Sequence, residues 1–290
     1  MLNRRFYEAE PWTYFRRRLS LLAEVADPES ELSRPTTPKE FTVGRVTVAL
    51  TPSADDGRSA DVSSRANTNF SAAEGEVLLH HTSETLLRLA LAHLPTSGGS
   101  LPACPWFEVA RLRAFQVFKK SIKERFVLLE DEAQRRAQAA ILFGDATTSR
   151  APVEDRLGEL VRYLEFYARV FLDSDAYNAA KHGFVLQAEH SAADVQVEGQ
   201  SIMAAAGPAL TYLHKEGAEW TLTTRWYSLE ATLALIYVAT NLIEALWYRA
   251  RMRYLGEGAR LAYTPPPLDA LTDHADGDVR RLMVMSQRIL

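Results

Sequence analysis

Hydrophobic residues recur at helical spacing over most of the chain and change to alternation in two places. The spacing predicts helices over residues 12–25, 71–94, 106–129, 131–143, 153–181 and 228–255. The alternating, β-branched stretch 41–50 predicts a strand, and the polar run 51–69 predicts a flexible loop before a helix that Ser71 caps. The chain is therefore expected to be mainly helical.

The second alternating region lies between residues 184 and 227. It contains four strand-like pieces separated by turn residues, FVLQAEH, DVQVEGQSIM, ALTYLHK and EWTLTTRWY. Connections this short join antiparallel strands, because a parallel crossover needs a dozen residues or more. The expected fold class is α+β, mainly α: a bundle of about five long helices with a small antiparallel β-sheet inserted before the last long helix.

The same pattern suggests how the chain is organised. Residues 1–69 hold an N-terminal helix, a strand and the polar loop, and residues 70–256 hold the helical bundle with the β insert at 184–227. Residues 257–290 form a tail rich in Pro and Gly, whose last residues are expected to make one short docking helix. Gly183 is expected to end the helix before the insert. We expect one globular domain in all.

The helix predicted from Leu229 to Tyr248 is nearly as long as a bilayer span and strongly apolar. Asn241 and Glu244 interrupt it. A carboxylate is costly in lipid but is tolerated in a protein core that supplies a partner. We therefore expect a central core helix with both polar side chains hydrogen-bonded inside the protein, and no membrane among the partners.

Composition narrows the range of functions. The chain has 290 residues, a net charge of −4, 47% hydrophobic and 24% charged residues, which is the profile of a globular protein and not of a disordered or polybasic one. Nucleic acid would thus have to meet a local basic patch. The run Arg16–Arg18 is one such patch, either a solvated helix face or a phosphate contact. Cys104 is the only cysteine, so no intramolecular disulfide forms, and a cytoplasmic location is expected.

Signatures with strict spacing argue against several enzyme classes. The sequence has no glycine-rich phosphate loop, paired-cysteine zinc site, two-histidine metalloprotease helix or nucleophile-elbow serine. Glu76, His80 and Glu84 follow one another at four-residue intervals, so a metal ion could lie along that helix, but ordinary ion pairing explains the same spacing. Because no second cluster matches it, neither a metal nor a cofactor is expected.

A narrow polar stripe crosses the leucine-rich helix at 71–94. His81, Glu84 and Arg88 are spaced three and four residues apart, so they lie along one side of the helix. An unpaired guanidinium is costly in a buried setting. We therefore expect Arg88 to pair with Glu84 or with a carboxylate of a neighbouring helix.

The most distinctive string is YNAAKHGF, residues Tyr177 to Phe184. Asn178 and His182 are one helical turn apart, and Lys181 lies beside them at a helix C-terminus. An imidazole next to an ammonium can act as a general acid or base, while the amide orients a phosphate or hydroxyl. The alternative is that all three only cap the helix and complement its dipole.

A bundle with Asn-x-x-Lys-His-Gly at a helix end, preceded by a core helix such as LLHHTSETLLRLALAH, resembles the HEPN superfamily of bacterial toxins and defence proteins. The resemblance covers the helices between Phe70 and His182. It implies a metal-independent ribonuclease with an Arg-x4-6-His motif, in which histidine transfers protons and arginine steadies the phosphate. It also implies a homodimer with a composite site.

The match to that motif is incomplete. Its one formal instance is Arg88-Leu-Ala-Leu-Ala-His93, whose end residues point about 140° apart on a regular helix. The nearest arginine upstream of His182 is Arg169, which leaves Lys181 to hold a phosphate as a point charge. Arg88 can assist only if its helix packs against the one that bears His182. The candidate catalytic residues are Asn178, Lys181, His182 and Arg88.

Two functions follow from these residues. The first is a HEPN-like protein that acts on or binds RNA or a nucleotide, in defence or stress, by attack of a ribose hydroxyl on the adjacent phosphodiester. The second is a non-catalytic interaction or scaffold protein, in which the same residues only cap and pair. The surroundings of His182 distinguish the two functions.

Overall fold

The computed structural model describes residues 2–26, 39–43, 46–50, 60–96, 99–144, 153–182, 186–197, 200–216, 219–257, 263–272 and 284–288. Side chains are described for residues 2–26, 69–96, 99–144, 156–181, 209–215, 219–257 and 263–272. The helices are α1 (Leu2–Tyr7), α2 (Pro11–Ala26), α3 (Ala60–His93), α4 (Pro105–Arg111), α5 (Phe115–Ile122), η1 (Lys123–Val127), α6 (Glu132–Phe143), α7 (Val153–Leu172), α8 (Asp175–His182), α9 (Leu229–Leu255) and α10 (Asp269–Thr272). The fold is mainly α with an antiparallel sheet before α9, as the hydrophobic pattern predicts.

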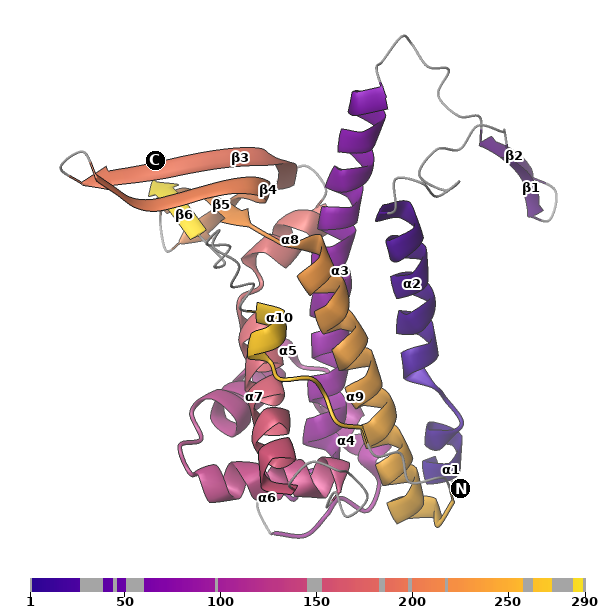
Figure 1. Cartoon of the computed structure of the whole chain (residues 1–290). Coiled ribbons are helices and arrows are strands. Elements are labelled where there is room, and N and C mark those ends of the chain that lie inside the picture. The colour runs from indigo at the N-terminus through magenta and orange to yellow at the C-terminus, as the bar shows by residue number, and fades with distance from the viewer. Residues whose placement is uncertain are drawn as a thin grey trace.

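Two long helices, α3 and α9, run side by side through the molecule and carry most of the core (Figure 1). Each is apolar around most of its circumference, so neighbours cover it on several sides. Helix α2 packs against both, and α7 packs against α3. The hydroxyl of Tyr167 on α7 donates to the carbonyl of Leu235 on α9 at 2.7 Å, which satisfies a fully buried phenol.

The polar positions of α9 have partners, as the sequence predicts. Arg16 of α2 donates to Asn241 Oδ1 at 3.0 Å and forms an ion pair with Glu244. Arg18, one residue beyond Arg17, forms an ion pair with Glu74 of α3. The arginine run is thus neither a purely solvated face nor a free phosphate contact, because its first and third members bind α2 to the two central helices.

Helix α9 is long and apolar enough to cross a bilayer by length and composition. Its most apolar stretch, however, is 56% buried inside the protein. Its side chains pack against α2, α3 and α6 in the core. This burial is that of a core helix.

The antiparallel sheet has the order β3-β4-β5-β6, with β3 (Leu186–Val197), β4 (Gln200–Glu216), β5 (Glu219–Trp226) and β6 (Val284–Arg288). Four short strands were expected in the insert, but it forms three. Strands β3 and β4 continue through the small residues 191–193 and 204–207, and their register shifts only between Val195 and Gln196. A separate hairpin joins β1 (Lys39–Val43) and β2 (Val46–Leu50), where one strand was expected.

The end of the chain departs from the expected docking helix. Residues Val284–Arg288 instead pair with β5 as its outer neighbour, from Thr221↔Arg288 to Arg225↔Val284. The exposed edge of β5 offers unpaired backbone groups, and a five-residue segment can satisfy them as a strand but is too short for a stable helix. The expected helix stop at Gly183 lies outside the described residues.

Several helix boundaries also differ from the pattern. Helix α3 begins at Ala60, within the predicted loop, because extending a helix adds one hydrogen bond per residue and costs far less than starting one. Ser71 therefore lies inside the helix, buried, and is not its cap. The predicted helix 106–129 is divided into α4, α5 and η1, and the predicted helix 153–181 is divided at Asp173 into α7 and α8. The predicted helix 131–143 is confirmed as α6, with Asp131 as its N-cap and Gly144 as its C-cap.

Candidate functional site

Helix α8 presents the predicted site residues at the point where it packs against α3. Ala176 and Ala179 are buried, whereas Asn178 and Lys181 are exposed, so the apolar and polar positions divide the helix into an inner and an outer face. Asn178 and Lys181 are three residues apart and share the outer face. The backbone of His182 ends α8, and its side chain lies outside the described residues.

Tyr177 connects α8 to two histidines of α3. Its ring stacks on His80 with the centroids 3.8 Å apart and the planes 5° from parallel, and its hydroxyl lies 3.1 Å from His81 Nε2. His80 is buried, with Nδ1 lacking a hydrogen-bond partner among the described atoms. Tyr177 belongs to the distinctive string but had no role in the sequence interpretation. Two adjacent histidines, His80 and His81, on a leucine-rich helix were the sequence signal that could have found this cluster.

Both histidines are neutral at pH 7. Burial, followed by the charge of His81, lowers the pKa of His80 to about 4. The pKa of His81 is lowered by partial burial first, then by the charge of Arg18, with Glu84 acting against them and Lys181 with them. His81 is half-buried, so the cluster places an uncharged imidazole beside a lysine at the surface.

The side chain of Asn178 makes one weak hydrogen bond. Its Nδ2 lies 3.4 Å from Ser174 Oγ, a long hydrogen bond within its own helix. Lys181 makes no ion pair with any side chain that the structure describes. The side chains of Asn178 and Lys181 are therefore available to a ligand, which a purely structural cap does not require.

Arg88 has a different position from the one that the candidate site needs. Its guanidinium forms an ion pair with Glu84, donates to the carbonyl of Leu112, and lies 4.0 Å from the ring centroid of Phe118. All three guanidinium nitrogens are occupied at the junction of α4 and α5. The expected pairing with Glu84 is confirmed. Helix α3 does pack against α8, but the contacts of Arg88 give it a structural role.

His93, the other end of the formal Arg-x4-His match, is buried in the core. Its Nε2 lies 2.6 Å from Tyr7 Oη, and its Nδ1 lies 2.6 Å from the carbonyl oxygen of Leu89. Because that carbonyl can only accept, Nδ1 carries the proton and Nε2 accepts from Tyr7. Burial lowers the pKa of His93 to about 4. A neutral, fully partnered histidine of this kind is structural.

The residues with metal-ligand spacing have other contacts. Glu76 lies 3.6 Å from Arg225, Glu84 pairs with Arg88, and His80 is covered by Tyr177. Among the described residues, no three His, Cys, Asp or Glu side chains lie close enough to hold a metal ion together. Ion pairing therefore accounts for this spacing in the part of the chain that is described.

Comparison with known proteins adds no assignment. The chain matches no protein-family model, no curated protein and no solved structure. Its function must therefore be argued from its own residues.

Proposed function

We propose that this chain is a HEPN-like cytoplasmic protein that acts on or binds RNA or a nucleotide at the contact of α3 and α8. The observation that carries the proposal is the meeting of neutral His81, Tyr177 and exposed Lys181 beside the backbone of His182. Two imidazoles and an ammonium supply the groups that metal-independent phosphodiester cleavage uses. Arg88 is left out of this site because its guanidinium is occupied elsewhere.

The reaction would be attack of a ribose 2′-oxygen on the adjacent phosphorus. One imidazole takes the 2′-hydroxyl proton, the bond from phosphorus to the 5′-oxygen breaks, and the other imidazole gives a proton to that oxygen. The products are a 2′,3′-cyclic phosphate and a 5′-hydroxyl. We assign His81, neutral at pH 7, as the base, which leaves His182 as the acid. Lys181 offsets the charge on the phosphate, and Asn178 orients it. The HEPN resemblance adds that two copies would form a composite site.

The test is incubation of the purified protein with end-labelled single-stranded RNA, with and without EDTA. We expect cleavage that survives EDTA and leaves cyclic phosphate ends. His182→Ala and His81→Gln should each lower the rate by roughly 10²-fold or more, which is the usual contribution of a proton-transfer group. Lys181→Ala should weaken RNA binding, whereas the matched variant Lys123→Ala, another exposed lysine, should not. Wild-type protein that neither cleaves nor binds RNA would refute the proposal.

A second candidate, an interaction protein, rests on exposed apolar side chains of α4 and α5. Phe107 is 63% exposed, and Phe115 and Val117 are each about half exposed. Large apolar residues at a surface often mark a protein contact. Under this function, light scattering should detect a dimer that Phe107→Ser together with Phe115→Ser dissociates, and His182→Ala should leave that dimer intact.

A further inference from the structure

A cavity of about 490 Å³ lies between the end of α3, η1 and α6. Its volume falls in the range of small-molecule sites, about 300–1,000 Å³. Most of the surface exposed inside it is apolar, and Leu129, Ala137 and Ile141 are among the residues that line it. The cavity is distinct in its residues from the contact of α3 and α8, so what it binds is independent of the function proposed above.

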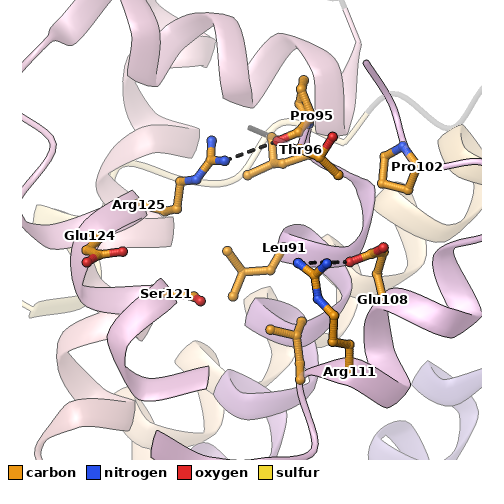
Figure 2. Close-up of a pocket in the computed structure, with 11 residues that line it drawn as sticks. Leu91, Pro95, Thr96, Pro102, Glu108, Arg111, Ser121, Glu124 and Arg125 are labelled. Carbon is orange, nitrogen blue, oxygen red and sulfur yellow. Dashed lines mark hydrogen bonds and ion pairs between the residues drawn. The ribbon is translucent and has the colours of Figure 1, made fainter. Parts of the chain in front are cut away.

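A second cavity, of about 260 Å³, adjoins the first. The two share Pro95, Thr96, Glu124 and Arg125 as a common wall. In Figure 2, Arg125 enters this region from one side and Arg111 from the other, with Leu91 between them. Arg125 is thus the one cation that lines both cavities among the described residues.

The charges around Arg125 are already matched to one another. Glu108 lies 3.3 Å from Arg111, and Glu124 lies 3.8 Å from Lys120. Arg125 itself donates from Nη2 to the carbonyl oxygen of Pro95 at 3.1 Å and has no carboxylate partner among the described side chains. A guanidinium with free donors in a partly buried wall is suited to bind a carboxylate, sulfonate or phosphate.

Gln138 of α6 supplies a second polar group beside the larger cavity. Its side chain is 95% buried, since only 5% is exposed, and its Nε2 has no hydrogen-bond partner among the described atoms. Buried amide groups nearly always have partners, so an unpartnered one calls for a specific explanation. An acceptor atom on a bound molecule would satisfy it.

The wall of the larger cavity includes a π-helical turn that contains Arg125 and precedes Leu129. Residues Lys123–Val127 form a π-helical turn, in which the amide of Leu128 donates to the carbonyl of Lys123 at 2.8 Å. The additional residue in a π turn rotates the following side chains by about 100° relative to an unbroken α-helix. Such turns occur frequently at functional sites.

We propose that this cavity binds a small organic anion, with its charged group on Arg125 and its apolar body against Leu129, Ala137 and Ile141. An acceptor on that body would meet Gln138. The ligand class is therefore an aromatic or aliphatic carboxylate, sulfonate or phosphate monoester. A neutral molecule of the same shape leaves Arg125 without its anion and binds more weakly.

The test uses 2-naphthoate and its neutral counterpart 2-naphthamide, titrated into the full-length protein and followed by NMR chemical shifts. We expect naphthoate to bind with Kd of about 1 mM or tighter. It should bind about tenfold more tightly than the amide, as a charge-assisted contact predicts. Arg125→Gln should remove that difference, and Ala137→Phe, which fills the cavity, should weaken both ligands.

Two measurements keep the result interpretable. Arg113→Gln changes an exposed arginine outside the cavity and should leave both affinities unchanged. Thermal unfolding checks that Arg125→Gln and Ala137→Phe remain folded. Equal affinity for acid and amide in the wild type, affinity unaffected by both cavity variants, or no binding of naphthoate at millimolar concentration would each overturn the proposal.

Discussion

The hydroxyl of Tyr7 lies 2.6 Å from Nε2 of His93, which joins the first helix of the chain to the end of α3 inside the core. Both side chains are almost completely buried. A hydroxyl that donates to a neutral imidazole satisfies both groups without placing a charge in the interior. The position of α1 therefore depends on the protonation of one histidine.

Stability should fall as the pH falls from about 6.5 to about 4. The folded pKa of His93 is about 4, below the 6.5 of an unfolded imidazole, so between these values only the unfolded chain binds the proton. The stabilisation is fully present above pH 6.5, and up to about 3 kcal/mol is lost on acidification. His93→Gln should reduce the slope by less than half, because His80 has a similar pKa, His81 also has a lowered pKa, and both still contribute. Urea unfolding at several pH values measures both slopes, and an unchanged slope in the variant would contradict the assignment.

Arg16→Ala should destabilise the fold by about 1–3 kcal/mol, because it leaves the largely buried Asn241 and Glu244 without their cation. The matched control is Arg17→Ala in the same run, an exposed residue whose loss should stay within about 0.5 kcal/mol. Equilibrium unfolding of both variants decides the matter. Equal effects would mean that the pairing with α9 is not what holds α2.

Arg88→Ala should cost about 2–3 kcal/mol, since it removes the ion pair with Glu84, a hydrogen bond to Leu112 and the contact with Phe118. Arg88→Lys should recover less than half of this, because an ammonium cannot make the forked contacts. The comparison is Arg111→Ala, whose side chain is 72% exposed and whose loss should cost little. Thermal unfolding distinguishes these outcomes. If Arg88→Ala leaves the unfolding midpoint unchanged, Arg88 has no structural role.

Two glycines should respond to alanine with opposite signs. Gly144 ends α6 at a φ of 79°, a conformation that favours glycine, and a Cβ there would lie 3.2 Å from the Arg249 guanidinium. Gly144→Ala should therefore destabilise the fold by about 1–2 kcal/mol. Gly158 lies inside α7 with only an ordinary contact to Arg136, so Gly158→Ala should stabilise by about 0.5–1 kcal/mol. Denaturant midpoints of the two variants provide the check, and effects of the same sign would contradict the local conformations.

The sequence by itself determined the elements whose causes are local. The apolar spacing predicted the helical frame, Asp131 and Gly144 bounded α6, and the polar interruptions of α9 predicted internal partners for Asn241 and Glu244. These features depend on periodicity, capping chemistry and the cost of burying an unpaired polar group. Each of these features can be recognised from a short stretch of the chain, although the sequence does not show which residue becomes the partner of Asn241 or Glu244.

Only the tertiary structure decided which distant residues meet. The sequence could not reveal that Tyr7 would bind His93, that Arg88 would face α4 and α5 instead of α8, or that residues 284–288 would pair with β5. Each of these contacts joins segments that many residues separate, and their partners are selected by packing and by the satisfaction of buried polar groups, not by local preference. The spacing of Arg88 and His93 along the sequence matched a motif. In the folded protein, however, the contacts of each residue give it a structural role.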